Sequence, residues 1–272
     1  MPINIMRTKI ISAVAMAAIA SAFSIAPVFA QAPAARKNAS GVTEAQRMAV
    51  LGAHGDKEID VRVQSLNKLI ARIQGLRNIS DAQKSSIENT LQSIVTNLQT
   101  LKTQVDAATS TADLRSDDKA VIDNYRVYAL VMPQLNIIAA SDRIVTISQM
   151  LGSVSQKLQS RLSSASGISN LSALQSDLSD IAAKAADAAS QAQAAVSEVS
   201  ALVPDQGDKT KMASNTAALK DARSKIRAAQ QDLVAARKDA EAIIQALVKW
   251  DKSVMSSSAA ASSTEAASSS QQ

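Results

Sequence analysis

The chain has no cysteine, a single histidine and very few aromatic side chains: of its 272 residues, one is Trp, two are Tyr and two are Phe. The absence of cysteine excludes disulfides, thiol nucleophiles and cysteine-ligated zinc. One imidazole cannot form a multi-histidine metal site, and so few aromatics cannot form a stacking platform for bases or sugars. Seven Gly and five Pro are too few for a turn-rich β-sandwich or barrel. The class that remains is a helical protein, for which we expect no metal and no cofactor.

The first 30 residues have the pattern of a secretory signal peptide. Arg7 and Lys9 precede an uncharged stretch, and the small residues Val28 and Ala30 stand where a signal peptidase reads. We therefore expect cleavage after Ala30 and export from a bacterial cytoplasm to the periplasm, the cell surface or the exterior. The alternative is an uncleaved anchor, because the 21 uncharged residues from position 10 to position 30 are long enough to cross a bilayer.

Charge gives little indication of a nucleic-acid partner. Removal of residues 1–30 takes two of the 29 basic residues and none of the 24 acidic ones, which leaves a net charge of +3. So small an excess is typical of a solvated surface rather than of a phosphate-binding one.

Helix signals organise the rest of the chain. Residues 31–55 are expected to be a flexible leader with a short helix at 43–53, because Thr43 and Gln46 form a capping box while Gly52 and Gly55 interrupt the pattern. From residue 56 to 255, apolar residues recur at alternating spacings of three and four, the seam of a coiled coil. These seams cover residues 59–73, 87–105, 137–158, 171–202 and 219–254.

Caps and turns divide these seams into about five helices. Ser80 with Gln83 starts the second helix, and Ser116 or Asp117 is expected to cap the third. The short link before Ser80 predicts that the first two helices fold back antiparallel. Residues 169–207 carry a net charge of −4 and residues 208–255 a net charge of +4, so the last two helices should form an antiparallel hairpin. The predicted fold is all-α: an elongated antiparallel bundle of coiled-coil hairpins, followed by a disordered Ser/Ala-rich tail at 256–272.

One segment of the third helix is unusually apolar. Residues 127–140 are interrupted only by Pro133, Gln134 and Asn136, and Pro133 should kink the helix near 129–133. A helix that is apolar all round is either buried or in contact with lipid. The candidate core or membrane residues are Tyr125, Tyr128, Leu130, Met132, Pro133, Leu135, Ile137 and Ile138.

The same region carries a resemblance. The stretch NYRVYALVMPQLNIIAASDR, residues 124–143, resembles a segment of uncharacterised bacterial α-helical proteins that are expected to be secreted. The resemblance covers about 20 residues. It implies export and a helical fold, and it implies no activity.

The residues that could carry chemistry have simpler interpretations. His54 lies between two glycines and is interpreted as an exposed loop residue. Asp117 and Asp118 are interpreted as dipole-stabilising residues at a helix start. The basic residues around Lys225 and Arg237 alternate with acids, as on a solvated helix face.

We therefore expect no catalysis, no small-molecule substrate and no nucleic-acid partner. The predicted function is a secreted or cell-envelope structural or interaction protein, which presents coiled-coil faces to a protein partner or to itself. The alternative is a membrane- or lipid-interacting helical protein, apolipoprotein-like or pore-forming, that uses residues 127–140.

Overall fold

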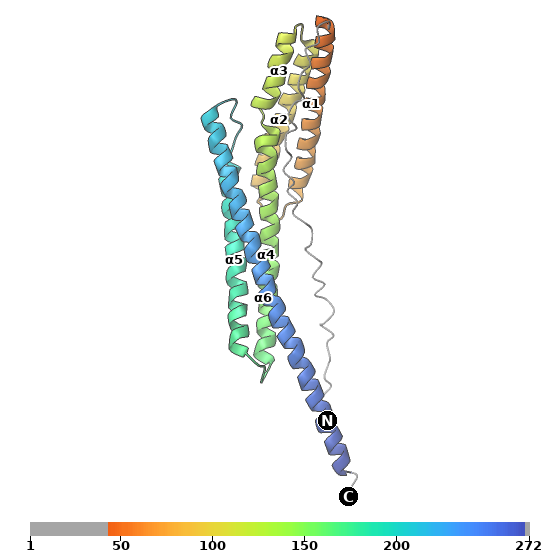
Figure 1. Cartoon of the computed structure of the whole chain (residues 1–272), viewed down its shortest axis with the longest axis vertical. Helices are drawn as coiled ribbons and strands as arrows, with labels where there is room; N and C mark the ends of the chain where they lie inside the picture. Colours follow the sequence, from red (N-terminus) through yellow and green to blue (C-terminus); the bar gives the residue numbers. More distant parts are fainter. Residues whose placement is uncertain (1–42, 270–272) are drawn as a thin grey trace. The chain divides into compact units, whose positions relative to one another are not determined.

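The computed structural model describes residues 43–269, and the expected signal peptide and the start of the leader lie outside them. The described residues form an all-α bundle, as the seams predicted (Figure 1). Its elements are α1 (Glu44–Gln74), α2 (Asp81–Ala107), α3 (Thr111–Asp123), the π-helix η1 (Val127–Val131), α4 (Met132–Ser164), α5 (Leu171–Ser200) and α6 (Lys209–Ser269).

Helix α1 starts at the predicted cap but does not stop at the glycines. The Thr43 hydroxyl accepts from the Gln46 amide, and the Gln46 side chain accepts from the Thr43 amide. The prediction of a break at Gly52 and Gly55 is wrong, because a helical glycine costs only about 1 kcal/mol and packing offsets it. At Gly55 a Cβ would lie 3.0 Å from Asp118 Oδ1, so the missing side chain lets α3 approach closely.

Helices α1 and α2 form the expected antiparallel pair. The Ser80 and Gln83 capping box is present, and Lys102 Nζ donates to Asp60 Oδ1 at 2.6 Å across the two helices. The connecting loop is held by the buried Asp142 of α4, whose Oδ1 accepts from the backbone amides of Arg77 and Asn78 at 2.7 and 2.6 Å. This loop is therefore fixed on the bundle by a charge-assisted cap.

The third predicted helix is divided into α3 and a second segment in which η1 runs directly into α4. Helix α3 begins at Ser110, whose hydroxyl accepts from the Asp113 amide at 3.1 Å, so the predicted cap at Ser116 or Asp117 is wrong. Helix α3 ends at Asp123, and Arg126, in the short link that follows, adopts a left-handed conformation with φ 43°. The break therefore precedes the kink that Pro133 was expected to cause.

Pro133 stands in the first turn of α4, where its missing N–H costs little. Immediately before it, the Met132 amide bonds to the Val127 carbonyl, the i to i+5 spacing of a π-turn. The wide turn and the proline together start α4.

Two hydrophobic clusters lie along α4, α5 and α6. The first joins α1, α2, α3, η1 and the beginning of α4 to the C-terminal half of α5 and the N-terminal half of α6. The second joins the end of α4 to the beginning of α5 and the middle of α6, and Trp250 packs on it. Many α5 and α6 residues in both clusters are alanines, which lets these helices approach closely.

Helices α5 and α6 form the predicted antiparallel hairpin. Lys184 Nζ donates to Asp239 at 2.7 Å, Gln191 Nε2 donates to Asp232 at 2.9 Å, and Lys225 Nζ donates to Glu198 at 2.9 Å. Each contact is one heptad from the next on both helices, with the numbers rising on α5 and falling on α6. This polar ladder fixes the antiparallel register.

Helix α6 continues beyond its expected end at Val254. It passes Arg161, which pairs with Asp251 at 2.9 Å, and extends alone past α4 and α5 to Ser269 (Figure 1). Residues 256–269 are thus helical, where the sequence predicted disorder. Their alanines favour helix, and the preceding helix already supplies the nucleus that a free tail lacks.

Candidate functional site

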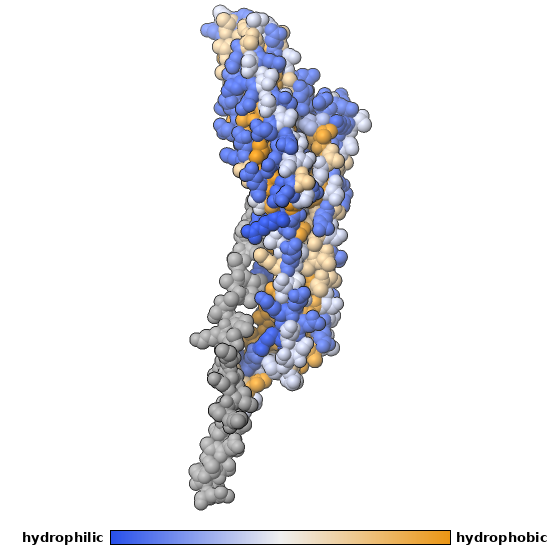
Figure 2. Space-filling view, turned by 180° about the vertical axis from the view of Figure 1, so that it is seen from behind, coloured by the Kyte–Doolittle hydropathy of each residue, from blue (hydrophilic) through white to orange (hydrophobic). Residues whose placement is uncertain are grey.

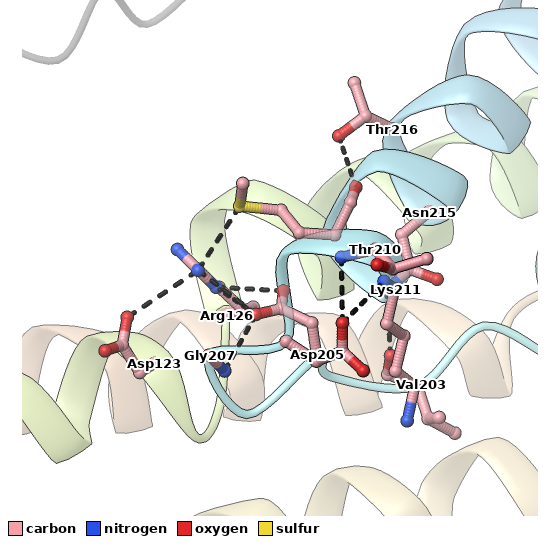
Figure 3. Close-up of polar contacts among 11 residues, drawn as sticks. Asp123, Arg126, Val203, Asp205, Gly207, Thr210, Lys211, Asn215 and Thr216 are labelled. Carbon is pink, nitrogen blue, oxygen red and sulfur yellow. Dashed lines mark hydrogen bonds and ion pairs between the residues drawn. The ribbon is translucent and has the colours of Figure 1, made fainter.

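A buried ion pair fixes the turn between α5 and α6. Asp205 is only 5% exposed, and its carboxylate accepts from Arg126 Nε at 3.0 and 3.2 Å and from Arg126 Nη2 at 3.1 Å (Figure 3). The Gly207 amide also donates to Asp205 Oδ1, at 3.0 Å. We call this pair the Arg126–Asp205 clamp. It joins two turns that are 79 residues apart in the chain.

The clamp sets the ionisation of Asp205. Burial alone would raise the pKa of this carboxyl, but the hydrogen bonds from Arg126 and from the Gly207 amide, with the Arg126 charge, hold the pKa below its usual value. The carboxylate therefore remains charged wherever an ordinary aspartate would.

Further polar contacts hold the same turn. Asn215 Nδ2 donates to the Val203 carbonyl at 2.9 Å, and Gln134 Nε2 donates to the Val199 carbonyl at 2.6 Å. Asp208 caps α6, since its Oδ1 accepts from the amides of Thr210 and Lys211. The turn is thus a rigid element rather than a free loop.

A cleft of about 720 Å³ lies between this turn, α2 and the α3–η1 junction. None of its lining residues is charged: Asn89, Thr90, Ser93, Ile94, Asn97, Asn124, Tyr125, Pro204 and Gln206. We call it the polar cleft. Its volume is within the range of protein ligand sites, roughly 300–1,000 Å³.

The polar groups of the cleft are available to a ligand. Among the described residues, no hydrogen bond joins the side chains of Asn89, Ser93, Asn97 or Gln206 to another residue, whereas the Thr90 hydroxyl donates to the Ser86 carbonyl. Tyr125 is half-buried, and burial raises the pKa of its phenol. Amides and hydroxyls both donate and accept, so the cleft suits an uncharged ligand rich in hydrogen-bonding groups.

The apolar segment predicted as core or membrane belongs to the first cluster. Its four aliphatic candidates are buried, and Tyr125, Met132 and Pro133 are half-buried. Those buried candidates are Leu130, Leu135, Ile137 and Ile138. Only Tyr128 is exposed, at 44%. On the face in Figure 2, hydrophobic areas are small and separated by hydrophilic ones. No helix in the described part of the chain has the length and hydrophobicity needed to span a bilayer.

Tyr128 has a partner that the sequence did not indicate. The Arg62 guanidinium lies over its ring, with Cζ 5.0 Å from the centroid, and Arg62 also pairs with Glu58. Arg62 is 7% exposed and sits between the core positions Ile59 and Leu66. Arg62 lies three residues after Ile59 and four before Leu66, so the only signal for it in the sequence was a charged residue at a seam position.

His54 and the acidic pair lie within helices rather than in a loop or at a helix start. His54 Nδ1 is 4.0 Å from Asp118 Oδ2. Burial raises the pKa of Asp118, and the neighbouring His54 opposes that rise. Asp117 lies within α3, so its predicted capping role is also wrong. Among the described residues, no group of three His, Cys, Asp or Glu side chains could hold a metal ion.

No protein-family model, curated protein or solved structure matches the chain.

Proposed function

We propose that the chain is an exported, non-catalytic binding protein of the bacterial envelope, which recognises a protein partner through its helical surfaces. The observation that carries this proposal is the polar cleft: an open, uncharged site with free amide groups, walled on one side by a clamped turn. The composition supports a role without catalysis in one respect, because the chain has no thiol nucleophile and only one imidazole.

The cleft favours an extended, uncharged polypeptide segment as its ligand. A peptide backbone offers one donor and one acceptor at each residue, which Asn and Gln side chains can match. Charged side chains would lose hydration in the cleft without gaining an ionic partner. The rigid α5–α6 turn keeps the ordering cost of binding low.

Site-specific photocrosslinking tests this proposal. A photoreactive residue is placed at Asn97 in the cleft and, as a control, at Asn67 on the exposed surface of α1, in protein expressed in its own cell. We expect one defined adduct from position 97 and none from position 67. The identified partner is then purified and titrated, and Asn97→Asp should weaken its binding at least tenfold while Asn67→Asp leaves it unchanged. Equal effects at both positions would refute the role of the cleft.

Lipid binding through residues 127–140 is the second candidate from the sequence. It requires the first cluster to open, because the segment's aliphatic side chains are buried. The bundle as it stands gives this use of the segment no support.

A further inference from the structure

The charged side chains of α6 divide into two sets. Its carboxylates from Asp208 to Asp251 all have partners within the protein. Asp221 and Glu241 pair with Lys225 and Arg237 on the same helix. The partners of the others lie on α5, on α4 or in the backbone of α6 itself: Asp232 with Gln191, Asp239 with Lys184, Asp251 with Arg161, and Asp208 with the first amides of α6.

The cations of the second set point to solvent. Lys220, Arg223, Arg227 and Lys238 are exposed and form no ion pair with any residue in the described range. The Arg227 guanidinium donates to the Arg223 carbonyl and to Ser224 Oγ, at 3.4 and 3.5 Å. These four residues, which we call the basic face, extend along about 27 Å of helix at 1.5 Å per residue.

The basic face turns away from the rest of the bundle. Lys225, Asp232 and Asp239 lie at heptad spacing on the side of α6 that contacts α5. Arg227 follows Lys225 by two residues, and Lys238 follows Asp232 by six. Neither spacing is a heptad, so both side chains lie on other sides of the helix than the one that contacts α5. Asp232 and Asp239 therefore lie on another side of the helix, whereas Glu241, two heptads after Arg227, lies on the line of the basic face, where it pairs with Arg237.

Apolar side chains accompany the cations. Val234 lies between Arg227 and Lys238 and is 70% exposed. Val248 and Met255 are 41% and 65% exposed, and they follow Val234 at multiples of seven residues, on the same line along the helix. Glu241, which pairs with Arg237, lies on this line between Val234 and Val248. Lys249 is exposed beside them. One side of α6 thus combines unpaired cations with isolated exposed aliphatic groups.

We propose that the basic face of α6 docks on a membrane surface that contains anionic phospholipid, with the helix lying in the plane of the headgroups. Long Lys and Arg side chains reach lipid phosphates while Val234 enters the interface between them. A lipid surface fits better than an acidic protein because it presents phosphate at one depth along the whole face and apolar matter just below. The inference uses none of the residues of the polar cleft and goes beyond the proposed function.

The magnitude follows from the number of cations. Each Lys or Arg near an anionic membrane contributes about fivefold to partitioning, so four together contribute several-hundred-fold at low salt. The attraction is screened over about 10 Å at 0.1 M salt, so binding should weaken steeply as salt rises.

Vesicle co-sedimentation tests the proposal with the chain as it is purified from its producing cell. The vesicles contain either equal parts of phosphatidylglycerol and phosphatidylcholine or phosphatidylcholine alone. The test variant is K220Q/R223Q/R227Q/K238Q. The matched control, K57Q/K68Q/R115Q/K119Q, removes the same charge from four exposed cations of α1 and α3 that form no ion pair within the described part of the chain. Circular dichroism and thermal unfolding confirm that both variants fold.

We expect salt-sensitive binding of the unaltered protein to the anionic vesicles only, loss of several-hundred-fold in the test variant, and a change below a few-fold in the control. Equal losses in the two variants would show a net-charge effect and overturn the proposal. Equal binding to vesicles of phosphatidylcholine alone would also overturn the proposal. So would a failure to bind the anionic vesicles, even if the protein binds a soluble polyanion.

Discussion

Replacing Asp205 by alanine removes the clamp between the α5–α6 turn and the α3–η1 junction. The substitution deletes three hydrogen bonds from Arg126 and one from the Gly207 amide. It also leaves Arg126, whose side chain is 18% exposed, with Asp123 at 3.6 Å as its one ionic partner among residues 43–269. Breaking a buried ion pair costs about 3–5 kcal/mol, and the partial exposure of Arg126 places this site near the lower value, about 3 kcal/mol.

Urea unfolding followed by circular dichroism measures that loss. For a domain of this size, about 3 kcal/mol corresponds to a fall in Tm of roughly 6–12 °C. Trp250 gives a second probe, because it packs on the second cluster, where its Nε1 donates to the Ser166 carbonyl at 3.0 Å. Coincident fluorescence and dichroism transitions would show that the two clusters unfold together.

Two controls make the reasoning refutable. Asp81→Ala, at a fully exposed carboxylate, should change stability by less than about 0.5 kcal/mol. A double-mutant cycle of Arg126→Ala and Asp205→Ala should show a coupling above about 1 kcal/mol, whereas additive losses would contradict the clamp. Because the folded-state pKa of Asp205 is lowered, its contribution is present above the unfolded pKa near 3.8 and is lost as the pH falls through the folded value. The difference between wild type and Asp205→Asn should therefore shrink only below about pH 4.

Three further predictions concern stability. Gly52→Ala should raise the free energy of unfolding by about 0.5–1 kcal/mol, because the new Cβ would meet no described atom within 4 Å. Gly55→Ala should leave the protein equally stable or less stable, because its Cβ would lie 3.0 Å from Asp118. Equal Tm shifts for the two variants would contradict this prediction. Lys184→Glu should lower the free energy of unfolding, measured in urea, by about 1 kcal/mol. Adding Asp239→Lys should restore most of that loss. If it does not, Lys184 and Asp239 do not stabilise the hairpin as a pair. Burial raises the pKa of Asp118, so the folded state favours the neutral form of this carboxyl. Asp118→Asn should therefore raise the Tm at neutral pH, and this gain should fade as the pH falls through the raised pKa. A gain in Tm that does not depend on pH would exclude burial of the charge as the cause.

Local signals in the sequence predicted most of the helices. The capping boxes at Thr43 and Ser80 mark the starts of α1 and α2 because each depends only on residues three apart. The seams of α5 and α6 identify buried positions because a 3.5-residue period leaves one face for the core. Gly55 misled the prediction, since its role is set by Asp118, 63 residues away in the chain.

The candidate site could not be predicted in this way. The polar cleft draws on residues 89–97, 124–125 and 204–206, which no periodic pattern connects. Asp205 stands in the stretch Pro204-Asp205-Gln206-Gly207, whose residue types are typical of a turn. Its bond to Arg126, however, depends on a left-handed arginine that nothing in the sequence indicates. The basic face was obscured for a similar reason, because acids whose partners lie on α5 or on α6 itself are interleaved with its cations along the chain.

The π-turn of η1 lets the chain absorb one residue more than an α-helix of the same rise would hold. Upstream, Arg126 is fixed by the clamp, and downstream, the buried residues of α4 are fixed by the core. An extra residue in an α-helix would rotate everything after it by about 100°. Deletion of Ala129, whose side chain is exposed, should return the turn to α-helical spacing and leave α4 in phase. Deletion of Gly152 should instead rotate the end of α4 away from its partners. The protein should therefore tolerate the loss of one residue in η1 but not in the middle of α4.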